Sequence, residues 1–521
     1  MKDRDALQRK RRIMAALAGL PSADGSGARV SGGAGVEIYP SSVRSLEDQS
    51  FVAARIDGRD SILVSSPKRF PDRFPAPVEE VEGRYLQIVS LDRQSVPVLW
   101  ELFPFTAPRV LRSVPATFGT GDRLALGNVG HVRAFVGSPA RPVLAQQSVR
   151  ELMQTGRTFA EVVAFAAYAV FREGYTDGFG ADGDHLKRHE EIVSSLDAGA
   201  TMITLDVSES LVPEAARWSD ADVEHAFGKL PTEIREAFSG TYAGRSFQLK
   251  RNGYGGGRSI LISPESARRC AVMYGRGIRQ AVEMIEGLRT HSSLQPHVEV
   301  SVDETSVPTD PAHHYMIIRE LRRQDSSPDS LAPRFVGEFQ KGIDYRGDPT
   351  AFRTQLEEHQ AIVDTLGGYK LSIHSGSDKF AVYPAIAEVT RGRLHVKTSG
   401  TSWLEAVRTL AEHDPELYRS MHGAAFEALE EMQRLYHITP DLAAIPALES
   451  LEDAELPQLM ENPNARQLLH VAYGKLLNEP AIGPAIRRSL LAHADEYAGR
   501  VEAHLRRHLR LLGVEGEKAA G

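Results

Sequence analysis

Between about Arg112 and Pro440, short apolar segments that end in polar or glycine-rich residues alternate with longer segments of helical periodicity. Short apolar runs bounded by turn residues indicate buried strands, and apolar residues at three- and four-residue spacing indicate amphipathic helices. Eight strands are predicted, at Ser113–Phe118, Val143–Gln146, Tyr175–Gly180, Thr201–Leu205, Val298–Val302, Arg334–Glu338, Lys370–Ile373 and Leu394–Val396. Eight strands with mostly helical connections predict an α/β fold, a (β/α)8 barrel of the TIM type, whose active sites lie at the C-terminal strand ends.

The connections support this interpretation. Helical patterns cover Phe159–Phe171, Pro311–Arg323, Ala351–Leu366 and Ser402–His413. A doubly wound sheet is the alternative, but no G-x-G-x-x-G or Walker pattern stands between a predicted strand and a helix, where it would bind a nucleotide.

The barrel is expected to be one of three parts. Residues 1–111 form a β-rich N-terminal region, residues 112–440 the barrel, and residues 441–521 a helical C-terminal extension. A long insertion at about 207–296 separates the fourth and fifth strands. Its glycine-rich basic segment, 250–258, is either a lid over an anionic substrate or the tip of a hairpin.

Composition narrows the class of protein. A hydrophobic share of 42% and a charged share of 25% are typical of a globular enzyme. The formal net charge of −8 gives no electrostatic reason to expect nucleic acid, so small molecules or proteins are the expected partners. Cys270 is the only cysteine, which excludes an intramolecular disulfide and a cysteine-ligated zinc cluster.

No apolar run is long enough to span a membrane. The segment Met1–Leu20 combines a basic run with a short apolar stretch, and we interpret it as a surface helix rather than an export signal. A cytoplasmic protein is therefore expected. The sequence leaves the oligomeric state open, a homo-oligomer included.

The stretch Gly178–Arg188 places two carboxylates, an imidazole and two cations behind a glycine-rich run. Asp184 and His185 are residue types that supply a metal ligand, an acid or a base. The alternative is a polar loop in which Asp184 caps the next helix. Asp182 is the rival carboxylate, should the local turn aim it inward.

Three further polar residues follow predicted strands. Glu304, in the pair Asp303-Glu304, is the preferred catalytic carboxylate, with a capping role as its alternative. His374 ends the next-but-one strand, and Gln340 follows Glu338. Two histidines and a glutamine or carboxylate on neighbouring strand ends can ligate one divalent cation and leave positions open for substrate.

Cations and a helix start indicate an anionic substrate. The segment Lys397–Ser402, which includes Ser399 and Thr401, joins a strand to a helix, where free backbone N–H groups and the helix dipole attract anions. Arg123, Lys187 and Lys341 also lie on loops of the predicted active face.

These segments together resemble the tagaturonate/fructuronate epimerase family of bacterial hexuronate catabolism. The resemblance spans about residues 112–440 and is carried by Phe118–Arg123, Gly178–Lys187, Ser301–Glu304, Phe339–Lys341, His374–Lys379 and His395–Thr401. It implies a metal-dependent barrel enzyme that interconverts D-tagaturonate and D-fructuronate without phosphorylated intermediates.

The resemblance also implies residue roles. Asp184 would be the proton acceptor and Glu304 the proton donor, with His185, Gln340 and His374 as metal ligands. Glu338 is the alternative to Gln340, because residues two apart on a strand point to the same face. The metal would be a divalent cation, and Zn, Mn, Co, Ni and Fe all suit such ligands. The predicted substrate-binding residues are Arg123, Lys187, Lys341, Lys397, Ser399 and Thr401.

The chemistry agrees with these roles. The two ketouronates differ at the carbon β to the ketone, so removal of an α-proton cannot invert it, whereas a retro-aldol and aldol sequence can. One alternative is a metal-dependent aldolase or isomerase of another unphosphorylated ketose or sugar acid. Another is a non-catalytic sugar-acid-binding protein.

Overall fold

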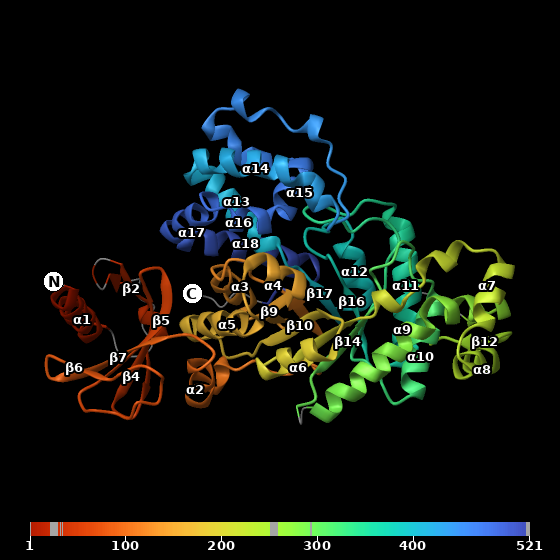
Figure 1. The fold of residues 1–521 in the computed structure, drawn as a ribbon, viewed down its shortest axis with the longest axis horizontal. Coiled ribbons are helices and arrows are strands. Elements are labelled where there is room, and N and C mark those ends of the chain that lie inside the picture. The colour runs from red at the N-terminus through yellow and green to blue at the C-terminus, as the bar shows by residue number, and fades with distance from the viewer. Residues whose placement is uncertain are drawn as a thin grey trace.

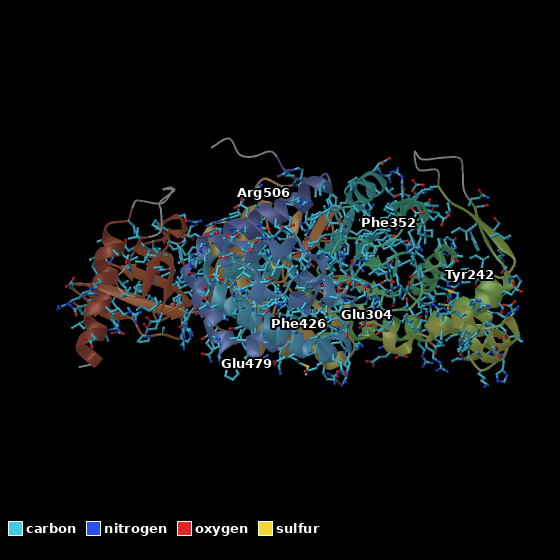
Figure 2. All side chains as sticks on the ribbon, turned by 90° about the horizontal axis from the view of Figure 1, so that it is seen from above. Tyr242, Glu304, Phe352, Phe426, Glu479 and Arg506 are labelled. Carbon is cyan, nitrogen blue, oxygen red and sulfur yellow. The ribbon has the colours of Figure 1, made fainter. Side chains whose placement is uncertain are left out.

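The computed structural model describes residues 2–20, 30–31, 33, 35–250, 259–291 and 294–516. An N-terminal sheet, a central barrel and an insertion lie in a row, and helices of the C-terminal part cover one side of the barrel (Figure 1). Figure 2 shows the same row from above.

The N-terminal part is a seven-stranded antiparallel sheet with strand order β1-β2-β4-β5-β7-β6 and β3 paired to β4. Its elements are α1 (Lys2–Ala18), β1 (Val30–Ser31), β2 (Val36–Ile38), β3 (Arg44–Leu46), β4 (Gln49–Ile56), β5 (Arg59–Ser66), β6 (Glu79–Val81), β7 (Arg84–Ser90) and α2 (Ser95–Leu102). Along β4, alternate side chains face opposite sides of the sheet. Phe51 packs with Tyr168 and Phe171 of the barrel helix α5, whereas Val52 packs with Ile13 of α1. The sheet is thereby attached to the barrel on one face and covered by α1 on the other.

The centre of the molecule is a closed barrel of eight parallel strands, in the order β10-β11-β14-β15-β16-β17-β8-β9. The strands are β8 (Ala116–Gly119), β9 (Arg141–Ser148), β10 (Gly180–Leu186), β11 (Met202–Asp206), β14 (His297–Ser301), β15 (Ser330–Ala332), β16 (Lys370–Ile373) and β17 (Leu394–Lys397). The connecting helices are α3 (Asn128–Phe135), α4 (Val149–Thr155), α5 (Phe159–Glu173), α6 (His189–Asp197), α10 (Pro311–Arg323), α11 (Pro349–Leu366), α12 (Tyr383–Thr390) and α13 (Thr401–His413). The predicted (β/α)8 fold is confirmed.

Local sequence signals explain where these helices begin. The side chain of Asp310 accepts a hydrogen bond from the backbone of Ala312, and Pro311 occupies the first turn of α10, where its missing N–H costs nothing. Helix α5 starts with a capping box between Thr158 and Glu161. It ends at Gly174, whose φ of 65° favours glycine.

Two predicted strands lie elsewhere. The strand predicted at Tyr175–Gly180 lies instead at Gly180–Leu186. The acidic and glycine residues that were interpreted as a loop form this strand, and the acidic side chains point into the barrel. The strand predicted at Arg334–Glu338 is Ser330–Ala332, and the later segment is a loop above the barrel. In both places the true strand contains buried polar residues, so its apolar pattern is weak. A nearby segment with aromatic residues has a stronger apolar pattern, and the prediction followed that segment.

The insertion consists of α7 (Asp220–Gly228), α8 (Thr232–Thr241), β12 (Arg245–Gln248), β13 (Ser259–Ile262) and α9 (Pro264–His291). The strands β12 and β13 pair antiparallel. The segment 250–258, interpreted as a lid or a hairpin tip, lies outside the described residues except for Lys250. None of the described helices is both long enough and apolar enough to cross a membrane.

The C-terminal part is helical and comprises α14 (Pro415–Gln433), α15 (Pro463–Val471), α16 (Tyr473–Asn478), α17 (Ile482–Ala492) and α18 (Ala494–Leu511). The buried Trp403 of α13 donates a hydrogen bond to the carbonyl of Leu469 at 2.8 Å, and its ring packs against Tyr473. These contacts fix the helical part beside the C-terminal ends of the barrel strands.

Candidate active site

A buried charge cluster occupies the barrel interior, formed by Lys397 and the carboxylates of Asp182, Asp184 and Glu299. None of these residues is more than 5% exposed. The ammonium of Lys397 lies 3.2 Å from Asp182 and 3.1 Å from Glu299, and it also donates a hydrogen bond to Asp184. Asp182 and Asp184 both reach it because residues two apart on a strand share a face.

One cation cannot neutralise three carboxylates, and the pKa values of Asp182 and Asp184 shift in opposite directions. Burial raises the pKa of Asp182 to about 6, with Lys397 only partly offsetting it. Burial also acts on Asp184, but Lys397 and His185 outweigh it and hold the pKa of this carboxyl below its usual value. Asp184 is therefore the more acidic carboxylate of the pair. The amide of Gln146 donates to its second oxygen at 2.7 Å.

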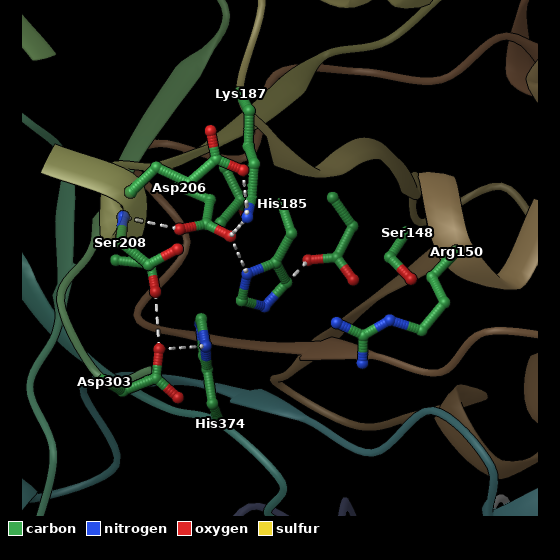
Figure 3. Close-up of polar contacts among 12 residues, drawn as sticks. Ser148, Arg150, His185, Lys187, Asp206, Ser208, Asp303 and His374 are labelled. Atoms are coloured by element: carbon green, nitrogen blue, oxygen red, sulfur yellow. Dashed lines mark hydrogen bonds and ion pairs between the residues drawn. The ribbon is translucent and has the colours of Figure 1, made fainter. Parts of the chain in front are cut away.

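Above this cluster lies an imidazole centre, formed by His185 and His374 with the carboxylates of Asp206 and Asp303 (Figure 3). The two rings are 5.0 Å apart between centroids. His374 Nδ1 lies 3.0 Å from Asp303, and His185 Nδ1 lies 3.7 Å from Asp206. Both Nδ1 atoms are buried and have no hydrogen bond of good geometry to a described residue.

Strict alternation would turn His185 away from Asp184, and a local irregularity prevents this. The pairing register of β10 shifts between Gly183 and Leu186, and His185 has a φ of 54°. Such bulges re-aim a side chain at the end of a strand. The ring of His185 therefore joins Asp184 at the barrel mouth.

On the far side of His374, Nε2 lies 2.7 Å from Glu299. The pKa of His374 is raised to about 10, because Asp303 and Glu299 outweigh burial. Asp303 is correspondingly acidic: although burial opposes ionisation, the imidazole of His374 holds its pKa far below the usual range.

A cavity of about 400 Å³ opens over both groups, a volume that suits a small sugar acid. Asp184, His185, Glu304 and His374 line it, together with Leu435, Tyr436 and His437 from the segment after α14. The carboxylate of Glu304 lies within 4.8 Å of ligand atoms of His185 and Asp206. The structure thus brings all five predicted catalytic and metal residues to the lining of one cavity, because Gln340 also lines it, as does Glu338.

Gln340 is different. Its side-chain oxygen accepts hydrogen bonds from Gln467 at 2.7 Å and from the backbone of Thr439 at 3.2 Å, so it faces the C-terminal part. Glu338 faces His437, with 3.1 Å between Oε2 and Nε2. Neither side chain makes a described polar contact with His185 or His374, and the geometry gives no support to either as a ligand.

Comparison with known proteins now adds to this geometry. The family model for tagaturonate epimerase matches residues 39–512. The chain belongs to the tagaturonate epimerase family. It is therefore an epimerase, an enzyme of the isomerase class, as the resemblance implied.

Two relatives of this epimerase illustrate the match. The tagaturonate/fructuronate epimerase of Thermotoga maritima is 37% identical over 481 residues, which cover 92% of this chain and 98% of the relative. The native crystal structure of fructuronate-tagaturonate epimerase from Cohnella laeviribosi is 39% identical, with a TM-score of 0.87 and coverage of 92% of this chain and 97% of that one. A glycerol complex of the same enzyme is 40% identical, with a TM-score of 0.86 and coverage of 92% and 96%.

The predicted substrate-binding residues of the epimerase take different positions. Ser399 lines the cavity and donates to Gln146, whereas Thr401 is buried against Ser377 and lies outside the described cavity lining. Arg123, Lys187 and Lys397 line the cavity but already form ion pairs, and Lys341 lines it with no ion pair or side-chain hydrogen bond to any described residue.

Sequence reasoning missed Glu299 and Asp206, and did not choose Asp303. A signal for Glu299 was present, because the alternation Val298-Glu299-Val300 in β14 places this acid on the opposite face from the two valines. Asp206 is the last residue of β11, at the active face. The reasoning that selected the other strand-end residues as site candidates therefore applied to it as well. Arg150 also lines the cavity, in the first turn of α4 and two residues after the end of β9, and it was likewise not chosen.

Proposed function

We propose that this epimerase interconverts D-tagaturonate and D-fructuronate by a retro-aldol and aldol sequence. The family membership supports the substrate pair. The observation that carries the mechanism is the meeting of the ionised Asp184, the imidazoles of His185 and His374, and Glu304 in one cavity of suitable size.

The reaction balances with one acid and one base. The base takes the proton of the hydroxyl on the carbon β to the ketone, and that carbon becomes an aldehyde as its bond to the α-carbon breaks. The electron pair passes into the ketone and forms an enediolate. After the aldehyde turns its other face, the bond re-forms and the acid returns the proton to the new alkoxide.

Asp184 is the proposed proton acceptor. Lys397 and His185 keep it ionised despite burial, and Gln146 fixes the orientation of its carboxylate. Glu304 is the proposed proton donor, on the loop after β14 and beside His185. Holding both groups around one substrate converts the proton transfers into steps within a single complex.

A divalent cation fits the imidazole centre. His185 and His374 present Nδ1 atoms that are buried without a well-formed hydrogen bond, and each faces a carboxylate, Asp206 or Asp303. Imidazoles and carboxylates suit Zn, Mn, Co, Ni or Fe. His185 and Asp206, whose ligand atoms lie within 4.8 Å of each other, would hold the ion together with His374 and Asp303. When bound, the cation would polarise the ketone and stabilise the enediolate.

The direct experiment is incubation with D-tagaturonate, with and without a chelator, followed by nuclear magnetic resonance of the sugar pool. We expect D-fructuronate to form and the chelator to abolish its formation. No turnover by metal-replete protein would refute the substrate assignment. Stoichiometric accumulation of three-carbon products in place of the epimer would indicate an aldolase.

Glu304→Gln tests the proposed proton donor. We expect turnover to fall about 10²- to 10⁴-fold, the usual contribution of a general acid or base. Substrate binding and metal content should persist. Unchanged turnover would remove Glu304 from the mechanism.

A further inference from the structure

The cations that line the cavity fall into two groups. Arg123 pairs with Glu151 at 2.8 Å, Lys187 with Glu209 at 3.0 Å, and Lys397 belongs to the buried charge cluster. Arg150, Arg334 and Lys341 also line the cavity, and none of them forms an ion pair with a described residue. A cation already bonded to a carboxylate has little left for a ligand, so the second group is where an anion would bind.

Arg150 is held in position without being neutralised. Its NH1 donates to the carbonyl of Leu435 at 3.2 Å, and its guanidinium carbon lies 5.4 Å from the ring centroid of Tyr436. Figure 3 shows the side chain extending toward His185 from the Ser148 side of the cavity. A guanidinium oriented in this way retains free donors for a bidentate contact with a carboxylate.

Lys341 also lines the cavity, in the loop after β15. Burial lowers its pKa, and its charge interacts with Glu151 and with Asp184 and Asp303 of the two neighbouring clusters. Arg334 lines the same cavity, and its backbone exchanges hydrogen bonds with Thr309 in the loop that follows β14. It has no described contact with the imidazole centre or with its carboxylates, and it serves as the comparison. Arg150 extends toward His185, and the charge of Lys341 interacts with Asp184 and Asp303, so these two cations are the candidates for the anion site.

We propose that Arg150 and Lys341 bind the terminal carboxylate of the substrate and so select a ketouronate over the neutral ketohexose of the same skeleton. This inference rests on the proposed function for the identity of the anion. It also fixes the orientation of the substrate, with the carboxylate toward Leu435 and Tyr436 and the ketone toward His185 and His374.

The orientation has a consequence for the reaction. Cleavage between the α- and β-carbons yields the enediolate of dihydroxyacetone and a three-carbon hydroxy-aldehyde that carries the carboxylate. The second fragment is the one that must turn. Arg150 and Lys341 would hold it by its far end, so that rotation about the bond to the aldehyde carbon presents the other face without loss of the fragment.

The test measures binding separately from turnover. The protein is titrated with D-fructuronate and with D-fructose, its neutral counterpart, and the shift of the melting temperature is recorded for wild type, Arg150→Gln, Arg150→Lys and Lys341→Gln. Arg334→Gln serves as the cavity comparison and Arg279→Gln, an exposed residue of α9, as the surface control. Melting temperatures without sugar show whether each variant is folded.

We expect D-fructuronate to stabilise the wild type more than D-fructose does. Loss of a charge-assisted hydrogen bond should weaken D-fructuronate binding about 10- to 100-fold in Arg150→Gln and Lys341→Gln, with D-fructose binding unchanged. Arg150→Lys should recover part of the loss. In turnover, KM for D-tagaturonate should rise by a similar factor, and three-carbon fragments should escape into solution.

Wild-type affinity for D-fructuronate in both glutamine variants would overturn the proposal, as would a preference that depends on Arg334 instead. If the uronate preference depends on Arg150 and Lys341 while the wild type does not epimerise D-tagaturonate, the carboxylate site stands and the proposed function fails. The two hypotheses are thus separable.

Discussion

Lys397 and Lys341 are lysines of the same cavity in opposite states. The ammonium of Lys397 contacts three carboxylates in the barrel interior, whereas Lys341, in the loop after β15, has no ion pair with a described residue. Removing one partner from a set of buried paired charges is costly, whereas an unpaired charge at a cavity wall is available to a ligand. Whether a lysine of this cavity is paired with carboxylates therefore distinguishes a structural role from a ligand-binding role, although the residue type is the same.

The largest expected effect comes from the interior. Lys397→Met would leave Asp182, Asp184 and Glu299 buried without their cation, and breaking such a network costs about 3–5 kcal/mol. We expect the free energy of unfolding, measured in urea, to fall by this amount and turnover to be lost. Lys341→Gln is the matched change at the wall, and we expect it to alter stability by less than about 1 kcal/mol. Equal losses in the two variants would contradict the distinction.

Next comes the difference between two carboxylates of one strand. Asp184 lines the cavity, whereas Asp182 lies below it, outside the described cavity lining, and accepts a hydrogen bond from Thr204. We expect Asp184→Asn to lower kcat about 10²- to 10⁴-fold, as removal of a general base does. Asp182→Asn should instead retain KM and most of kcat, since its carboxyl has no path to substrate. A larger kcat loss in Asp182→Asn would make Asp182 the base.

Lys370, at the N-terminal end of the interior, provides a pH test. Burial lowers its pKa from 10.5 to about 7, although its ammonium donates to Thr117 at 2.9 Å. Between these two values the unfolded chain binds the proton and the folded chain does not, so stability rises with pH from about 7 to about 10.5. We expect a gain of a few kcal/mol over this window. The measurement is urea unfolding at both ends of the window, with Lys370→Met as the control that should lose this increment; an equal gain in the variant would assign the effect to another group.

The fold was largely predictable, and the site was predictable in part, for physical reasons. Helices such as α10 and α11 carry an N-cap aspartate and a proline at their starts, which are local signals. The strand β10 was misplaced because Asp182 and Asp184 are stabilised by Lys397, more than two hundred residues away in sequence. No local rule indicates such a partner. For the same reason the sequence nominated Arg123 and Lys397 as substrate ligands but could not reveal that both were already paired.

The smallest expected effect concerns Gln340, which the sequence nominated as a metal ligand and the structure turns toward Gln467 and Thr439. Gln340→Leu removes hydrogen bonds between the loop after β15 and the C-terminal part, each worth about 1 kcal/mol. We therefore expect a slightly lower melting temperature and an unchanged metal content by elemental analysis. His374→Ala is the comparison, and its metal affinity should fall strongly because it removes an imidazole of the proposed centre. Loss of metal from Gln340→Leu to the same extent would show that the loop re-orients when the cation binds, and would restore Gln340 to the ligand set.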